Sequence, residues 1–179
     1  MFKVVVFLIL SLVSAYASAT CSPIRDFSAQ KLRSQETINF CNAFDDKVLL
    51  VVNTASKCGF TPQFKELESL YQRYRAKGLE IVGFPSNDFS QEFSDSKKTA
   101  NICYINYGVT FTMLEASSVK GTNANTLFKM LAEATGHAPG WNFNKYLISR
   151  TSHDIRHYAS RVSPLSNQLD ADIRMMLSE

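Results

Sequence analysis

A continuous apolar run, Val48–Val52, and a second, largely apolar stretch, Leu79–Phe84, place the strongest constraint on how this chain folds. Runs of this length without polar alternation are typical of strands that are buried on both faces of a sheet. Between them, apolar residues recur at intervals of three and four, which predicts an amphipathic helix. We expect it to begin at Thr61 and Pro62, with the Thr61 hydroxyl as its cap, and to end at Gly78. This order predicts an α/β fold around a mixed sheet.

The rest of the chain continues the alternation without a repeat, a low-complexity tract or a charge block, so we expect a single domain. Two short strands at 24–30 and 37–41 predict an amino-terminal β-hairpin. Later elements are expected at 96–104 (helix), 109–114 (strand), 123–136 (helix capped by Asn123), 145–149 with 155–159 (hairpin), and from 167 onward (helix). The predicted architecture is a mixed central sheet flanked by helices, with a hairpin before it.

The first nineteen residues differ in composition from the rest. Lys3 precedes an apolar run from Val4 to Val13, and small residues follow at 14–19. This pattern is typical of a secretory signal peptide, and the run is about half the ~20 residues that a membrane-spanning helix needs. We therefore expect residues 1–19 to be a signal peptide and residues 20–179 to be an exported domain, periplasmic or secreted, with no stable membrane span.

The composition argues against several classes of function. The 19 basic and 16 acidic residues are scattered through the chain, so the basic stripe of a nucleic-acid-binding protein is missing. The three histidines, His137, His153 and His157, lack partners at ligand spacing, and there is no glycine-rich phosphate loop. Neither a metal nor a nucleotide cofactor is expected.

Cys58 lies between the first buried strand and the predicted helix start, with Lys57 beside it. Free N–H groups and the positive end of the helix macrodipole favour a thiolate there, and the thiolate is the nucleophilic form of cysteine. The stretch from Cys58 to Thr61 has no second cysteine, unlike the Cys-x-x-Cys of dithiol oxidoreductases. It favours a sulfur that attacks a peroxide and becomes a sulfenic acid. The alternative is an inert buried cysteine.

Four segments resemble the glutathione peroxidase family. They are Val52–Leu67, Gly83–Phe89 followed by Gln91-Glu92, Tyr107–Phe111 and Trp141–Leu147, in the family's order. The resemblance implies a thioredoxin-like fold and an enzyme that reduces hydrogen peroxide and organic hydroperoxides. It also implies a monomer, because the segment before Trp141 is short, as in monomeric members.

The resemblance further implies a catalytic tetrad of Cys58, Gln91, Trp141 and Asn142. An indole N–H and two amide groups suit this role, since donors that converge on a thiolate favour its charged form and hold developing negative charge. The chain departs from the family near Gln91: Ser86 and Asp88 replace Cys and Gln, Phe93 replaces Pro, and one residue is missing before Gln91. We expect a differently placed loop there.

The oxidised Cys58 must be reduced, either directly by glutathione or through a second cysteine that thioredoxin-type proteins reduce. Cys103 is the internal candidate, although it stands one place earlier than the resolving cysteine of two-cysteine members. Its alternative role is that of a core residue. An export signal also predicts a structural disulfide between Cys21 and Cys41.

Two rival functions stay open at this point. One is an exported thioredoxin-like thiol-disulfide oxidoreductase. The other is a non-catalytic member of the same fold, which the altered loop around Asp88 makes plausible.

Overall fold

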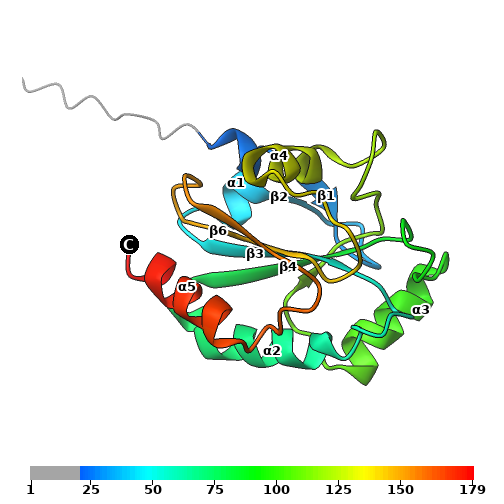
Figure 1. Ribbon diagram of the computed structural model, residues 1–179. Coiled ribbons are helices and arrows are strands. Elements are labelled where there is room, and N and C mark those ends of the chain that lie inside the picture. Colours follow the sequence, from blue (N-terminus) through cyan, green and yellow to red (C-terminus); the bar gives the residue numbers. More distant parts are fainter. Residues whose placement is uncertain (1–20) are drawn as a thin grey trace, which may run out of the picture.

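The computed structural model describes residues 21–179, so the predicted signal peptide lies outside the described residues. In chain order the elements are η1 (Pro23–Arg25), β1 (Ser28–Gln30), β2 (Thr37–Asn39), α1 (Phe40–Ala43), β3 (Val48–Thr54), α2 (Gln63–Tyr74), η2 (Arg75–Lys77), β4 (Leu79–Pro85), α3 (Ser96–Ala100), η3 (Asn101–Asn106), β5 (Thr112–Met113), α4 (Thr126–Thr135), β6 (Lys145–Ile148), β7 (Ile155–Tyr158) and α5 (Asn167–Leu177). Figure 1 shows helices on both sides of a central sheet. No helix within residues 21–179 is long and apolar enough to cross a membrane.

The central sheet has the strand order β5-β4-β3-β6-β7. Strand β3 lies in the middle, parallel to β4 and antiparallel to β6, and all seven of its residues are buried. The predicted mixed sheet and its two buried strands are confirmed. Alternate residues of β3 point to opposite faces, as the pleat requires, so that Leu50 and Val52 enter one core and Leu49 and Val51 the other.

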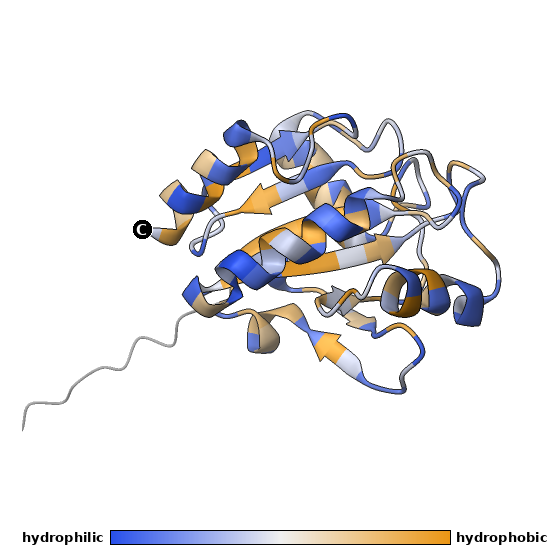
Figure 2. Ribbon diagram, turned by 90° about the horizontal axis from the view of Figure 1, so that it is seen from below, coloured by the Kyte–Doolittle hydropathy of each residue, from blue (hydrophilic) through white to orange (hydrophobic). Residues whose placement is uncertain are grey.

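Two hydrophobic cores result, one on each face of the sheet. Helices α2 and α5 cover one face through Leu67, Leu70 and Ile173, whereas α1 and α4 cover the other through Phe40 and Phe128. The strands of the sheet are largely hydrophobic in Figure 2, while the helices mix hydrophobic and hydrophilic residues. Each helix therefore buries one stripe and leaves the other in water.

The amino-terminal and carboxy-terminal hairpins are confirmed. Strands β1 and β2 pair antiparallel, as do β6 and β7. Helix α2 continues into the 3₁₀ turn η2 and ends at Gly78, which has a left-handed φ of 103°. Left-handed backbone of this kind favours glycine because glycine has no Cβ to clash.

Several predicted boundaries are wrong. The strands expected at 24–30 and 37–41 are shorter, because Ile24 lies in the 3₁₀ turn η1 and Phe40 begins helix α1. The strand expected at 109–114 is only two residues long, because the N–H of Val109 bonds the Cys103 carbonyl and that of Thr110 bonds the Glu68 carboxylate. Helix α4 is capped by Asn125, whose side chain accepts the N–H of Phe128, and not by Asn123. The helix expected at 96–104 extends to residue 106 and is π-helical in its second half.

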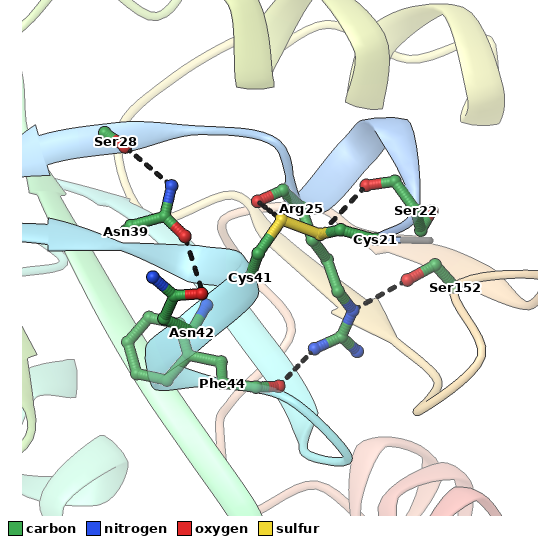
Figure 3. The surroundings of a disulfide bond; sticks show 9 residues. All are labelled: Cys21, Ser22, Arg25, Ser28, Asn39, Cys41, Asn42, Phe44 and Ser152. Carbon is green, nitrogen blue, oxygen red and sulfur yellow. Dashed lines mark hydrogen bonds between the residues drawn. A yellow bond between two sulfur atoms is a disulfide. The ribbon is translucent and has the colours of Figure 1, made fainter. Parts of the chain in front are cut away.

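A disulfide joins Cys21 to Cys41, which confirms the predicted pair (Figure 3). It ties the start of the described chain to helix α1. Beside it, the buried guanidinium of Arg25 donates to the carbonyls of Phe44 and Ser149 at 2.6 and 2.8 Å. The disulfide thus closes the amino-terminal region on itself, and the Arg25 guanidinium links that region to Ser149, directly after β6.

Replacing both Cys21 and Cys41 with Ser should lower the free energy of unfolding by about 3 kcal/mol, because the disulfide closes a loop across 20 residues and restricts the unfolded chain. Urea unfolding followed by circular dichroism measures this loss. As a control, a phosphine reductant should destabilise the parent by a similar amount and leave the double variant unchanged. Equal stability of parent and variant would contradict a structural role.

Candidate active site

Cys58 lies in a series of turns between β3 and α2, and the Thr61 side chain holds these turns together. The Thr61 hydroxyl accepts the N–H of Cys58 at 3.0 Å and donates to the Ala55 carbonyl at 2.9 Å. Thr61 is therefore not the cap of α2 that its sequence position predicted. The helix begins two residues later, at Gln63, without a side-chain cap.

One backbone donor reaches the sulfur within the described part of the chain: the N–H of Phe60, 3.4 Å from Cys58 Sγ. The N–H groups of Thr61, Gln63 and Phe64 instead bond carbonyls three residues earlier, so these expected free donors are already used. Cys58 is unpaired and only 7% exposed. It lines a cavity of about 580 Å³ together with Ser56, Gly59, Thr61, Pro62, Ile102, Asn106 and Tyr107.

Gln91 and Asn142 come together although 51 residues separate them. The Asn142 amide donates to Gln91 Oε1 at 2.9 Å, and the Gln91 carbonyl accepts the N–H of Lys57 at 2.9 Å. The second bond places the Gln91 backbone directly beside the neighbour of Cys58. Asn142 is fully buried, and its Oδ1 has no hydrogen-bond partner in the described residues.

The shortened loop before Gln91 is held by Asp88. The Asp88 carboxylate accepts the hydroxyl of Ser118 and the N–H groups of Val119 and Lys120, all within 3.1 Å. A carboxylate with three donor groups is well satisfied and fixes the loop on the chain that follows β5. Asp88, which replaces the family's Gln, therefore has a structural role. Although the loop is one residue shorter than in the family, Gln91 lies against Asn142.

Trp141 lines a second, smaller cavity. It is 42% exposed, and its ring packs against Phe89 with centroids 5.3 Å apart. The cavity, of about 280 Å³, is lined by Trp141 together with Phe60, Gly140, Asn144, Ala159, Ser160 and Arg161. Phe60 lines this cavity, and its N–H bonds Cys58 Sγ, which lines the first one.

Cys103 is fully buried and forms no disulfide. It lies in the π-helical segment η3 and packs in the same core as Cys58. Burial, reinforced by the nearby Glu92 carboxylate, raises the pKa of the Cys103 thiol to about 12. In this conformation Cys103 is a protonated core residue.

The ammonium of Lys57, the neighbour of Cys58, lies over the Phe93 ring, 4.7 Å from the centroid. This is a cation–π contact with the residue that replaces the family's Pro. Lys57 therefore contacts the loop that carries Gln91 in two ways. Its ammonium lies over the Phe93 ring, and its N–H bonds the Gln91 carbonyl.

Sequence reasoning missed a buried lysine behind the site. Lys145 is fully buried and donates to the carbonyls of Phe143 and Val162, both at 2.8 Å. Burial lowers its pKa to about 7, with Glu66 opposing the shift. A lysine at the start of the apolar stretch 145–148 is the signal that would have found it. Among residues 21–179, no group of three side chains could hold a metal ion.

The chain matches the family model described as "Glutathione peroxidase" over residues 24–132. It is 43% identical over 157 residues to the glutathione peroxidase of Lactococcus lactis subsp. cremoris, an alignment that covers 85% of this chain and 98% of that protein. The chain belongs to the glutathione peroxidase family. This confirms the resemblance found in the sequence, and it makes the protein a thiol peroxidase, an oxidoreductase.

Two further glutathione peroxidase relatives agree with this assignment. The hydroperoxy fatty acid reductase gpx1 of Synechocystis is 41% identical over 148 residues, covering 75% of this chain and 85% of that protein. The crystal structure of Trgpx in apo form superposes with a TM-score of 0.70 at 32% identity, covering 90% of this chain and 98% of that one. The thioredoxin-like fold is thereby confirmed.

Proposed function

We propose that Cys58 is the sulfur of this peroxidase that attacks the terminal oxygen of hydrogen peroxide or an organic hydroperoxide. A sulfur–oxygen bond forms as the oxygen–oxygen bond breaks; Cys58 is oxidised to a sulfenic acid and the peroxide is reduced. The departing oxygen takes a proton and leaves as water or an alcohol. The observation that carries this proposal is an unpaired sulfur that lines a cavity and already accepts a backbone N–H.

Gln91, Trp141 and Asn142 are proposed to assist this step as donors to the oxygen that develops negative charge. Support comes from the Gln91–Asn142 bond and from the bond between the Gln91 carbonyl and Lys57, beside Cys58. The unpartnered Asn142 Oδ1 can only accept, so it can receive the O–H of an entering hydroperoxide but cannot itself donate to the developing oxyanion.

Organic hydroperoxides suit the second cavity. Its aromatic walls, Phe60 and Trp141, offer apolar surface to a hydrocarbon chain, and Phe60 also adjoins the sulfur. The name of the Synechocystis relative, a hydroperoxy fatty acid reductase, agrees with this substrate class. No resident cofactor takes part in the proposed cycle, and the chain is proposed to act as a monomer.

Glutathione is the reductant that this conformation favours. Cys103 is buried and protonated, so it cannot attack the Cys58 sulfenic acid unless segment η3 opens. A small thiol can instead enter the cavity that Cys58 lines. Reduction by a thioredoxin-type protein would require a Cys58–Cys103 disulfide and therefore local unfolding of η3.

Replacing Cys58 with Ser should lower peroxidase turnover by at least about a thousandfold, because losses of this order or larger follow removal of an enzyme's nucleophile. Consumption of hydrogen peroxide and cumene hydroperoxide, coupled to glutathione recycling, measures the loss. Circular dichroism establishes that the variant is folded. A folded variant that keeps more than a few per cent of parental activity would refute the role of Cys58.

Replacing Cys103 with Ser separates the two routes of reduction. With glutathione as the donor, turnover should stay within about twofold of the parent, because no step uses Cys103. With thioredoxin as the donor, any turnover of the parent should disappear in the variant. If the parent turns over faster with thioredoxin than with glutathione and the variant loses the thioredoxin activity, η3 opens during catalysis and Cys103 is the resolving residue.

Export is proposed for the domain that follows residue 19. The Cys21–Cys41 disulfide supports it, since structural disulfides persist in oxidising compartments. The full chain expressed in a bacterial host should be recovered from the periplasm or medium with its amino terminus at Thr20, as read by mass spectrometry. Leu8→Arg combined with Leu10→Arg should keep an uncleaved chain inside the cell. Cytoplasmic recovery of an uncleaved parent would contradict export.

A further inference from the structure

The loop that carries Trp141 is fixed by its own carbonyl, which accepts two side-chain amides. Nδ2 of Asn144 lies 2.7 Å from the Trp141 oxygen, and Nδ2 of Asn53 lies 3.0 Å from it. Asn53 belongs to β3, the strand that leads to Cys58. The two amides therefore tie the tryptophan loop to the strand that carries the sulfur.

Asn144 has a second partner that sets the orientation of its amide. Its Nδ2 also donates to Ser160 Oγ at 3.1 Å, and its Oδ1 faces Nε2 of His157 at 2.7 Å. Because Oδ1 can only accept, His157 must carry its proton on Nε2. His157 thereby keeps the Nδ2 end of Asn144 directed at the Trp141 carbonyl.

His157 is itself held in place. Its ring stacks on His137, with centroids 4.9 Å apart and planes at 16°. Burial, with His137 and Lys145 adding to it, lowers the pKa of His157, so the neutral ring that donates from Nε2 is favoured at neutral pH. The sequence analysis considered this histidine only as a metal ligand, and its contacts show a hydrogen-bonding partner that no sequence pattern indicated.

We propose that Asn144 and His157 are positioning residues for Trp141, and that they hold its indole where it assists peroxide reduction at Cys58. This inference rests on the proposed role of Trp141. Neither residue reaches the sulfur, so both act only through the tryptophan loop. Disturbing them should lower the rate of Cys58 oxidation and loosen Trp141, without abolishing either the fold or the chemistry.

The tryptophan is the only one in the chain, so its fluorescence reports on this loop alone. Asn144→Asp keeps the acceptor for His157. It removes both hydrogen bonds that Nδ2 donates, and it places a carboxylate oxygen against the Trp141 carbonyl. Trp141 should then show lower anisotropy and stronger acrylamide quenching. The second-order rate of Cys58 oxidation should fall about five- to tenfold, less than the ~10² that a misplacement of 1 Å can cost, because Asn53 still holds the carbonyl.

His157 provides a matched pair of variants. His157→Gln retains an N–H that can reach Asn144 Oδ1, and it should preserve both the fluorescence and most of the rate. His157→Phe removes that donor and should reproduce the effects of Asn144→Asp. His153→Gln is the control, because His153 is an exposed histidine of the same hairpin with no hydrogen bond to this network. It should change neither measurement.

Stopped-flow oxidation by stoichiometric peroxide gives the rates, and circular dichroism shows which variants fold. If Asn144→Asp does not fold, the His157 pair decides the matter. Parental rates in folded Asn144→Asp and His157→Phe would overturn the inference, as would a lower rate with unchanged Trp141 fluorescence. An inactive parent would instead refute the proposed function, and the fluorescence of the variants would still decide whether the two residues position Trp141.

Discussion

The burial of β3 on both faces is the constraint on which the rest of the structure depends. Water is excluded from the whole strand, so the polar groups that it brings into the interior must find partners within the protein or stay unpaired, and Thr54 Oγ1 finds none among the described residues. Asn53, near the end of the strand, finds its partners in the tryptophan loop: its side chain bonds Trp141 and Asn144, and its carbonyl accepts the N–H of Phe143. Leaving one such group unpaired costs about 1–3 kcal/mol. The end of β3 and the tryptophan loop are therefore joined because the buried polar groups of Asn53 need hydrogen-bond partners.

Much of this fold follows from local sequence. The apolar stretches within β3 and β4 and the apolar stripe of α2 carry their own signals, because burial selects residue type at fixed spacing. The start of α4, in contrast, carries no local signal that fixes its position. Asn123 and Asn125 are equally good caps in isolation, and the choice is made by tertiary contacts: the Asn125 side chain also donates to Ser117 Oγ, and its N–H bonds the Ser118 carbonyl.

The site was predictable in part for the same reason. Cys58 stands out because a strand, a cysteine and a helix follow one another in the chain. The contact between Gln91 and Asn142 rested on a family resemblance, since no local pattern relates residues 51 positions apart. Asn144 gave no signal at all. An asparagine in a polar stretch is unremarkable until the fold brings Asn53 and His157 against it.

The four cysteines illustrate how burial separates redox roles within one domain. Cys21 and Cys41 are oxidised at the edge of the molecule, whereas Cys58 and Cys103 stay reduced in the core. Thiol–disulfide exchange requires a thiolate with access to the disulfide sulfur. The Cys103 thiol meets neither condition, because it is fully buried and its pKa is raised to about 12. Burial therefore keeps Cys103 out of exchange with the Cys21–Cys41 disulfide, and any event that exposes Cys103 also removes this protection.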